Sequence, residues 1–501
     1  MRSRTLDHDL RATAARSPAH EAVVGYDHRL TYDQLDRWAS VVAQGLLRCG
    51  VTRGDRVAVV MRSSAKTAAV VYGALRAGAA VVPVSARAPS SRQLDLVARC
   101  GAVAVVADGD LAHGLVSSGP VRVLDAEELV LGQGDATVDG PALVPVLGVD
   151  LAAVVFTSGS TGEPRGATFL HSGMHFAADA VAQSLGVTGG DRLLSVLPLS
   201  HTYGLYQLLV SVKRGATLVL EDGVGLPGDL LARMVAERIT VLPGVPSLWH
   251  VLLGSPRFTA QALPDLRLVT NAGALLPVAR VAALLAALPG VEVCSMYGQT
   301  ECARVCTLAP GLLAQHPGSV GLPLPGTEVL VVDAEGREVE RDQVGELLVR
   351  GEHVMQGYWN DPEATAAALL PGRLPGDRVL RTGDLFRRDV DGRLAFVGRR
   401  DDMITTRGEK VAPRSVEEVL CTAPGVLEAA VIGVVDEALG EAVVAHVTAR
   451  PGTSLEPRLI RRHCAVHLED FQVPRRVVVH ATLPTLDNGK LDRSALQALS
   501  R

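Results

Sequence analysis

Short apolar segments alternate with amphipathic stretches through the chain before residue 320, and this alternation constrains the fold more than any other feature. The segments are rich in valine, leucine and alanine, and they are continuously apolar. Strands of this kind are buried on both faces, so helices must cover both sides of a largely parallel sheet. We expect strands within residues 55–61, 80–85, 102–108, 151–157, 216–222, 239–246 and 266–274.

The pattern changes after residue 320. Residues 327–333, 345–351 and 393–398 read as short strands between glycine and aspartate turns, which indicates a β-rich subdomain. The sequence therefore predicts an α/β protein whose large N-terminal domain, residues 1–400, combines layered α/β sheets with this subdomain.

A smaller unit follows, at residues 401–501. Helical patterns at 414–423, 458–467 and 492–500 alternate with strand-like segments such as 475–480. About 100 residues of this kind is the size of one small domain. We expect an α+β C-terminal domain that is joined to the rest by a short hinge.

Charge and cysteine usage exclude several classes of protein. The 501 residues carry a formal net charge of -5, so no overall field draws the chain to nucleic acid or to an anionic membrane. The long uncharged stretch 193–212 contains proline, histidine and serines, and it predicts a strand, a loop and a helix in place of a membrane span. The cysteines lack a CxxC pair, and Cys302 and Cys306 have no partners for a zinc site. Reduced thiols and a start without an apolar signal segment favour a cytoplasmic protein.

A buried strand runs directly into a loop rich in glycine and hydroxyl groups at residues 154–171. Glycine lets backbone N–H groups approach a phosphate, hydroxyls add donors, and Arg165 adds positive charge. The Walker spacing is absent, because Gly159 and Gly162 are too close and no lysine is present. A flexible surface turn is the alternative, but the position after a strand favours a polyphosphate site. Its expected contacts are Thr157, Ser158, Gly159, Ser160, Thr161, Gly162 and Arg165.

This loop resembles the core motif of the adenylate-forming superfamily, which includes acyl-CoA synthetases, adenylation domains of non-ribosomal peptide synthetases and beetle luciferases. That motif usually reads TSGSTGxPKG, and Arg165 stands in place of the family lysine, with different reach and geometry. Other segments resemble the remaining family motifs in the family order. They are residues 30–35, 76–84, 197–205, 270–277, 296–304, 381–385, 398–420 and 487–493. The chain is most similar to AMP-forming acyl- or aryl-CoA ligases.

The resemblance implies ATP, Mg²⁺ and CoA as ligands. Tyr297 is expected to stack on adenine, Thr300 to bind the α-phosphate and Glu301 to hold Mg²⁺, which prefers carboxylates together with substrate phosphates. Asp384 and Arg399 are expected to bind the ribose, since one carboxylate can accept from two vicinal hydroxyls. The other nucleotide contacts are expected at Gly273, Ala274, Gly298 and Gln299.

The family reaction has two halves, and the resemblance assigns further residues to them. A carboxylate first attacks the α-phosphorus of ATP, with Lys490 as the catalytic lysine beside His201, Thr300 and Glu301. The small domain is then expected to rotate about Asp401, so that a thiol reaches the acyl-adenylate through a tunnel beside Gly408.

The acid is expected in a pocket lined by residues from three motifs: Thr202, Tyr203, Asn271, Cys302, Ala303 and Arg304. His201 and Thr202 stand where amino-acid-activating relatives carry Phe-Asp, which argues against an α-amino acid because a buried ammonium needs a carboxylate. Arg304 can pair with an acidic group of the substrate, but we expect a structural or surface arginine, since arginine is seldom buried without a partner. An aryl or medium acyl acid is the expected class.

Other functions fit the same motifs. The first alternative is an enzyme that loads a carrier protein in place of CoA. A second adenylates nitrite and joins it to an aryl amine, and a luciferase-like oxygenase is more remote. A non-catalytic nucleotide-binding protein is disfavoured, because Glu301, Asp384, Arg399 and Lys490 are all in place.

Overall fold

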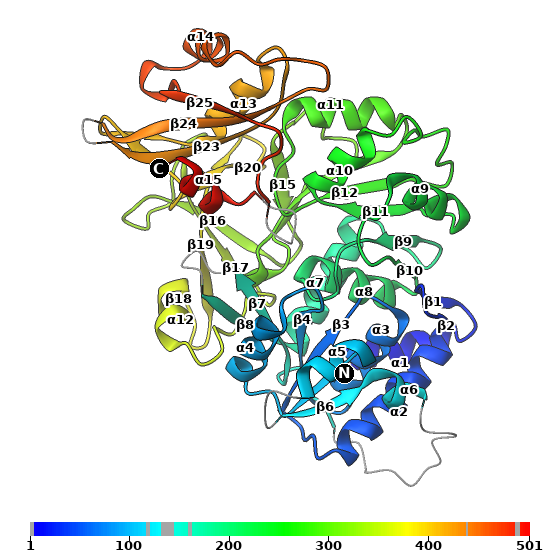
Figure 1. Cartoon of the computed structure of the whole chain (residues 1–501). Coiled ribbons are helices and arrows are strands. Elements are labelled where there is room, and N and C mark those ends of the chain that lie inside the picture. Colours follow the sequence, from blue (N-terminus) through cyan, green and yellow to red (C-terminus); the bar gives the residue numbers. More distant parts are fainter. Residues whose placement is uncertain are drawn as a thin grey trace.

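The structure is a computed structural model that describes residues 5–116, 121–131, 145–158, 163–436, 439–485 and 491–500. Two sheets with their helices form the large N-terminal part, and a third forms the C-terminal domain at the top of Figure 1. The predicted α/β class, with layered sheets and a smaller C-terminal domain, is confirmed. Within the described ranges, no helix has the length and apolar character that crossing a membrane requires.

The first sheet has six strands in the order β6-β5-β3-β4-β7-β8, all parallel except β8, which is antiparallel to β7. The strands of this sheet are continuously apolar because each of its two faces packs into a different hydrophobic core. In β3, Val57 and Val59 face one hydrophobic core, and Ala58 and Val60 face another, because successive side chains point to opposite sides. The strands are β3 (Arg56–Met61), β4 (Ala80–Ser85), β5 (Ala104–Ala107), β6 (Arg122–Asp125), β7 (Leu151–Ser158) and β8 (Pro164–Leu170).

Helices cover both faces of this sheet. One layer joins α3 to α2, α6 and α1, and the other contains α4 and α5. The helices are α1 (Leu6–Arg16), α2 (Tyr32–Arg48), α3 (Ala65–Arg76), α4 (Ser90–Cys100), α5 (Gly109–Val116) and α6 (Ala126–Leu131). A capping box fixes the start of α2, where Thr31 and Gln34 bond each other's backbone N–H groups.

The second sheet has fourteen strands and changes character at β13. On one side, β13-β12-β11-β9-β10-β1 are parallel, with β2 antiparallel at the edge. The strands of this half are β1 (Glu21–Val24), β2 (Arg29–Thr31), β9 (Arg192–Ser195), β10 (Thr217–Leu220), β11 (Val241–Gly244), β12 (Leu268–Asn271) and β13 (Glu292–Tyr297). The accompanying helices are α7 (His171–Ser184), α8 (Thr202–Arg214), α9 (Pro227–Ala236), α10 (Pro246–Leu253) and α11 (Val278–Ala287).

Beyond β13 the same sheet is antiparallel, which is the predicted β-rich part. Its elements are the 3-10 turn η1 (Thr300–Cys302), β14 (Cys306–Thr307), β15 (Ser319–Pro323), β16 (Glu328–Val332), β17 (Gly345–Arg350), α12 (Pro362–Ala368), β18 (Leu369–Pro371), β19 (Arg378–Arg388) and β20 (Leu394–Arg399). Ligands of open α/β sheets bind beyond the carboxyl ends of parallel strands. The transition at β13 therefore places the start of the antiparallel half beside that edge.

The C-terminal domain has a five-stranded sheet in the order β22-β21-β24-β23, with β25 paired to β24. Helices α13 and α14 contact each other over one apolar core, and α15 contributes Leu496 to a second. The elements are β21 (Ile404–Thr406), β22 (Glu409–Val411), α13 (Pro413–Thr422), β23 (Val426–Asp436), β24 (Gly440–Ala449), α14 (Pro457–His467), η2 (Asp470–Gln472), β25 (Arg476–His480) and α15 (Arg493–Ser500). Helix α13 also contacts α11 of the N-terminal part.

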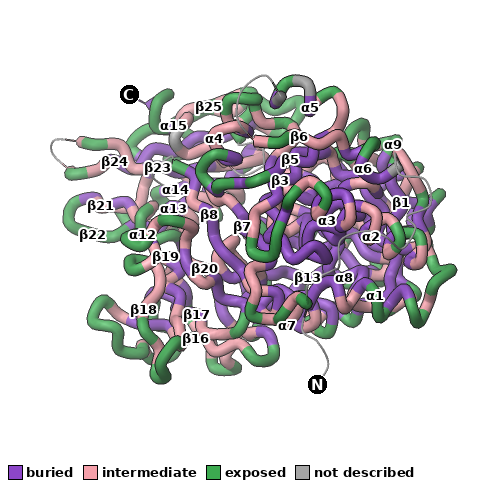
Figure 2. The backbone as a smooth tube through the Cα atoms, turned by 90° about the horizontal axis from the view of Figure 1, so that it is seen from below, coloured by how far each residue is buried: buried purple, intermediate pink, exposed green. Residues whose placement is uncertain are grey.

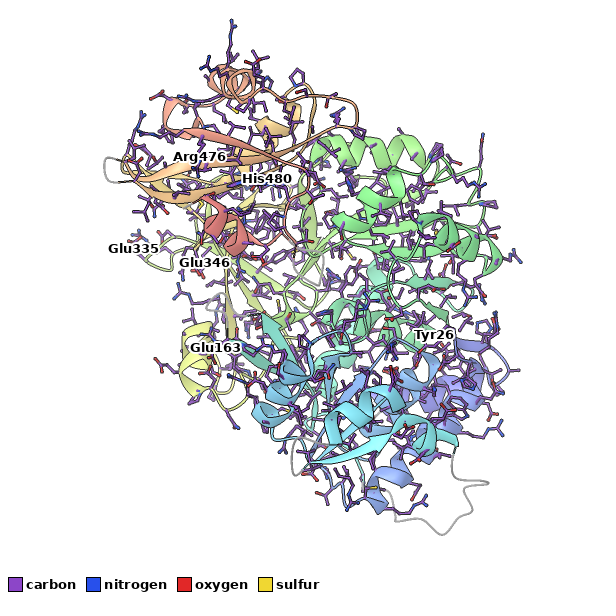
Figure 3. The ribbon with its side chains drawn as sticks, in the orientation of Figure 1. Tyr26, Glu163, Glu335, Glu346, Arg476 and His480 are labelled. Atoms are coloured by element: carbon purple, nitrogen blue, oxygen red, sulfur yellow. The ribbon has the colours of Figure 1, made fainter. Side chains whose placement is uncertain are left out.

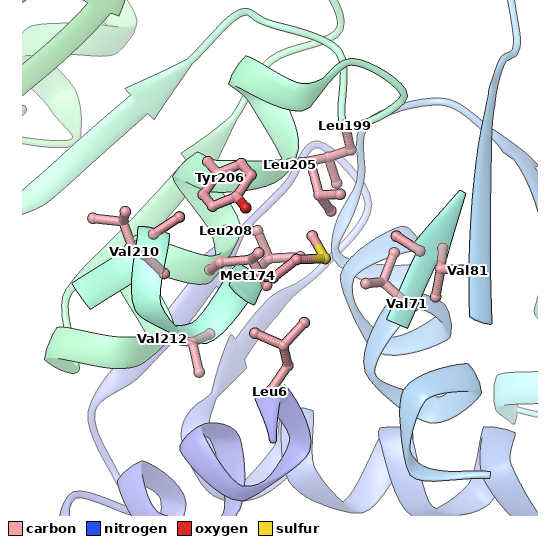
Figure 4. Close-up of a cluster of buried hydrophobic side chains, with 14 of the residues drawn as sticks. Leu6, Val71, Val81, Met174, Leu199, Leu205, Tyr206, Leu208, Val210 and Val212 are labelled. Carbon is pink, nitrogen blue, oxygen red and sulfur yellow. The ribbon is translucent and has the colours of Figure 1, made fainter. Parts of the chain in front are cut away.

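The largest core lies between the two N-terminal sheets. Leu6 of α1, Val71 of α3, Met174 of α7 and Leu208 of α8 all belong to it (Figure 4). Buried backbone fills the centre of the molecule in Figure 2, while the outer loops are exposed. The uncharged stretch 193–212 is β9, a loop and the buried helix α8, as predicted.

Candidate active site

Four predicted nucleotide contacts come together where β13 meets the antiparallel half of the large sheet. The hydroxyl of Tyr297 donates to Asp384 Oδ2 at 2.7 Å, and Gln299 Nε2 donates to the same oxygen at 2.7 Å. Arg399 Nε lies 3.1 Å from Asp384 Oδ1. A carboxylate, a guanidinium, a phenol and an amide thus form one cluster from three separate segments.

The strand register explains this cluster. Asp384 on β19 is paired directly with Arg399 on β20, so the two side chains are neighbours across the ladder. The ring of Tyr297 packs edge-on against Phe386 at 4.8 Å, which fixes it at the end of β13. Asp384 is buried, whereas the side chain of Arg399 is 52% exposed and available to a ligand.

Electrostatics in this cluster favour a charged pair and a neutral phenol. Burial and the neighbouring Asp384 carboxylate raise the pKa of Tyr297. Burial opposes the charge of Arg399, but Asp384 and Asp402 outweigh it and raise the pKa of the guanidinium. Tyr297 therefore acts as a hydrogen-bond donor at neutral pH.

Glu301 lies in η1, directly after the cluster. Its Oε1 accepts a hydrogen bond from the hydroxyl of Tyr358 at 2.9 Å, and its backbone carbonyl accepts from the N–H of Met355 at 2.9 Å. The segment that contains Tyr358 also pairs with β8, the strand that leaves the glycine-rich loop. Glu301 is thereby tied to the exit of that loop.

Sequence reasoning missed Tyr358. The residue follows Gly357, whose φ of 149° turns the chain, but no periodicity or known motif spacing singles it out. Arg165, predicted as a phosphate contact, lies over the ring of Tyr358 at 5.7 Å and 3.8 Å from Asp361. The arginine, the phenol and the Glu301 carboxylate form a second polar cluster.

The donor set fits a nucleotide and its metal. An acidic oxygen and an exposed guanidinium suit ribose hydroxyls and phosphate, and Gln299 adds an amide. No group of three metal-ligating side chains occurs among the described residues. A single carboxylate such as Glu301 still suits Mg²⁺, which takes its other ligands from phosphates and water.

Two of the residues predicted to line the acid pocket, Thr202 and Tyr203, lie at the start of α8. His201 is the residue before this helix, and its carbonyl accepts from the N–H of Leu205. The hydroxyl of Tyr203 lies 2.8 Å from Thr270 Oγ1 on β12. Asn271 is fully engaged in a different contact, accepting from Trp249 Nε1 at 2.9 Å. Asn271 also donates to the carbonyl of Ala274 at 2.8 Å, so both polar atoms of its side chain are bonded within the protein.

Arg304 was expected to be a structural or a surface arginine, and the surface alternative is wrong. Only 8% of the residue is exposed, and its guanidinium lies 4.8 Å from the centre of the Tyr203 ring. Cys302 is also buried, in the main hydrophobic core. Ala303, between the two, has a φ of 53°, which is uncommon for a residue with a Cβ.

This backbone conformation follows from a close approach of two segments. A Cβ on Gly298 would lie 2.0 Å from the carbonyl oxygen of Ala303, so glycine is required there. The N–H of Val305 donates to the carbonyl of Tyr297 at 2.9 Å. The chain therefore folds back on itself after η1 and directs Arg304 toward α8.

The junction with the C-terminal domain is anchored by a buried carboxylate that sequence reasoning also missed. Glu346 of β17 accepts from Arg381 at 2.8 Å, from Arg400 at 3.1 Å and from the N–H of Gly383 at 3.2 Å. Figure 3 labels Glu346 below β25, the strand of Arg476 and His480. The predicted hinge residue Asp401 follows Arg400 directly and is exposed.

The remaining predicted residues have simple placements. Gly408 has a φ of 84°, and nothing lies within 4 Å of where its Cβ would be. Gly273 also has a positive φ, and the carbonyl of Ala274 accepts from Asn271. Thr300 begins η1, and Thr202 begins α8. Gly159, Ser160, Thr161, Gly162 and Lys490 lie outside the described residues.

Comparison with known proteins identifies the family of the chain. The AMP-binding enzyme family matches residues 10–359, and the AMP-binding enzyme C-terminal domain matches residues 415–490. The chain belongs to the AMP-binding enzyme family.

Similar proteins include acyl-CoA ligases and a biosynthetic protein. The chain is 33% identical to novobiocin biosynthesis protein H of Streptomyces niveus, across 97% of this chain and 81% of that protein. It is 32% identical to a feruloyl-CoA synthase of Amycolatopsis sp, across 95% of each. ATP-bound MatB from Rhodopseudomonas palustris superposes with a TM-score of 0.91 at 27% identity, covering 99% of both chains.

Proposed function

We propose that this enzyme activates a carboxylic acid with ATP, forming an acyl-adenylate and pyrophosphate, and then transfers the acyl group to the thiol of CoA. The observation that carries the proposal is the cluster of Tyr297, Gln299, Asp384 and Arg399, which suits the ribose side of a nucleotide. The relative named as a feruloyl-CoA synthase supports CoA as the acceptor.

The residues divide the work of the first step. Asp384 and Arg399 hold the ribose, and Glu301 holds Mg²⁺, which neutralises charge on the phosphates. Arg165 and the glycine-rich loop bind the phosphate chain, and Lys490 stabilises the charge that develops during attack. Such a reaction needs positioning and electrostatic stabilisation from the protein.

The second step follows from the domain arrangement. We infer that residues 401–501 form the mobile unit and rotate about Asp401, which is exposed next to the anchored Arg400. Gly408 then lines the path of the thiol, where its open surroundings leave room for a narrow chain.

The test is pyrophosphate release from ATP and Mg²⁺ with a panel of carboxylic acids, with and without CoA. We expect acid-dependent release that CoA accelerates, and a loss of about 100-fold or more in Lys490→Ala. Lys66→Ala is the matched control, because Lys66 pairs with Glu127 and belongs to none of the motifs. No release with any acid would refute the proposal, and release that CoA leaves unchanged would assign the second step to a carrier protein or an amine.

A further inference from the structure

Arg304 is a buried cation without a counter-charge. Its Nε atom is enclosed and has no hydrogen-bond partner, and no hydrogen bond or ion pair to Arg304 occurs in the part of the chain that the structure describes. Its guanidinium lies over the face of the Tyr203 ring, at 4.8 Å from the ring centre. Arginine is rarely buried unless it is paired, because an isolated buried charge is costly.

The titratable groups that act most strongly on Arg304 do not supply the missing charge. They are a tyrosine and three cysteines: Tyr203, Cys294, Cys302 and Cys306. Burial raises the pKa of the Cys294 thiol to about 12, and it raises the pKa of the other two thiols and of Tyr203 as well. All four groups are therefore neutral at pH 7, so none of them balances the positive charge of the guanidinium.

Within the described parts of the chain, other polar atoms near this cation also lack partners. The hydroxyl of Tyr206, whose titration Arg304 influences, is enclosed without a hydrogen bond. Thr202 Oγ1, one helical turn earlier on α8, is likewise enclosed and unpaired. Buried polar atoms are normally satisfied, so a cluster of unsatisfied atoms indicates a missing ligand.

The position agrees with a ligand site. Tyr203 is held by Thr270 on β12, beside β13, so Arg304 lies beyond the carboxyl ends of these parallel strands. A guanidinium that stacks on an aromatic ring uses its face and keeps its N–H edge for a planar anion, above all a carboxylate. The 8% of Arg304 that remains exposed gives such a group access.

We propose that Arg304 binds a second acidic group of the substrate, so that the enzyme selects a carboxylic acid carrying an additional carboxylate. This inference rests on the proposed function, since the first carboxylate is the one that reacts with ATP. Tyr206 and Thr202 donate hydrogen bonds to the same second group. The strained Ala303 holds Arg304 in the orientation that this requires.

The test compares dicarboxylic acids of increasing length, each paired with its own monoamide, in the pyrophosphate assay. For the best-fitting length we expect the wild type to prefer the dicarboxylic acid by at least about 30-fold in kcat/KM. Arg304→Gln should abolish this preference and leave kcat/KM for the monoamide within about threefold of wild type. Arg304→Lys should keep part of the preference, because lysine retains the charge without the planar fork.

Two controls separate recognition from a structural role. Arg238→Gln, at a side chain that is 76% exposed, should leave the preference unchanged. The dicarboxylic acid should raise the Tm of the wild type but not of Arg304→Gln, whose own ligand-free Tm should equal or exceed that of the wild type. An equal loss of activity toward both acids of a pair, or a lowered ligand-free Tm, would make Arg304 structural and overturn the inference. Activity confined to neutral acids would overturn it while leaving the proposed function intact, and no activity with any acid would refute the proposed function itself.

Discussion

Arg399 and Arg304 lie on the two sides of the candidate active site, and they differ in both exposure and charge pairing. Arg399 is half-exposed and already paired with Asp384 at 3.1 Å, within a cluster whose groups have partners. Arg304 is buried and stacks on Tyr203, and the titratable groups that act on it most strongly are neutral at pH 7. Under the proposed function, the nucleotide side is assembled before any ligand binds, whereas the acid side is completed by the ligand. In that case a shared substrate can be recognised by a preformed network, while a particular acid is selected by a charge that the protein itself does not pair.

A substitution in the Asp384 cluster should cause the largest loss of activity. Asp384→Ala removes the carboxylate that holds Tyr297, Gln299 and Arg399 together, so we expect acid-dependent ATP–pyrophosphate exchange to fall by about 1,000-fold. Asp333→Ala, in an exposed pair with Arg337, is the matched control and should stay near wild-type activity. Exchange that survives Asp384→Ala would remove this carboxylate from the nucleotide site.

A buried histidine without a partner can lose its proton and become neutral, which an arginine such as Arg304 cannot do. Neither ring nitrogen of His353 has a hydrogen-bond partner among the residues that the structure describes, and burial lowers its pKa from 6.5 to about 4. The unfolded chain binds this proton below pH 6.5 and the folded protein does not, so stability is full above pH 6.5 and falls as pH drops toward 4.

The expected loss is at most about 1.4 kcal/mol per pH unit for one such histidine, measured by denaturant unfolding between pH 7 and 4. His353→Phe should flatten the slope, because Phe retains the contact with Phe176 and binds no proton. His467→Phe, at an exposed position, should leave the slope unchanged. An unaltered slope in His353→Phe would show that other groups carry the pH dependence.

A smaller loss of activity is expected at Tyr358, beside the proposed Mg²⁺ ligand Glu301. Tyr358→Phe removes the hydroxyl that donates to Glu301 but keeps the ring beneath Arg165. We expect kcat/KM to fall by about tenfold and the Mg²⁺ concentration for half-maximal activity to rise. A Mg²⁺ titration that matches wild type would separate Tyr358 from metal binding. Tyr26→Phe, an exposed tyrosine labelled in Figure 3, is the control.

The smallest effect should come from relaxing the backbone beside Arg304. Ala303→Gly removes the Cβ at a φ of 53°, so we expect a gain in stability of about 1 kcal/mol. The preference for a dicarboxylic acid should fall by about threefold, because Arg304 is oriented less firmly. Asp342→Gly, at a φ of 62° in a distant turn, should stabilise the protein similarly without altering the preference.

Much of the fold could be predicted because its strands are local. The segment 80–85 coincides with β4, and the other predicted strands overlap β3, β5, β7 and β10 to β12, since buried parallel strands leave uninterrupted apolar runs. The joining of both halves into one fourteen-stranded sheet could not be predicted. That continuity depends on pairings such as β13 with β14, which no local pattern records.

The candidate site also contains residues that could be predicted from local motifs and residues that could not. Asp384 and Arg399 belong to motifs, and the structure places them together. Tyr358 and Glu346 were missed because their partners are remote in sequence: Tyr358 reaches Glu301, and Glu346 reaches Arg400. A surface position was one expectation for Arg304 because arginine is seldom buried without a partner, and only the folded chain shows the reversal after Gly298 that buries it.

The pairing at the edge of the large sheet also determines when the N-terminal strand β1 can fold during translation. Strand β1, at residues 21–24, pairs in parallel with β10, at residues 217–220, and so it cannot join its sheet until nearly two hundred further residues have been synthesised. Until then the N-terminal segment offers unpaired backbone groups to whatever it meets. The nascent chain therefore spends much of its synthesis with its beginning unplaced, and slower translation prolongs the time in which chaperones must shield that segment.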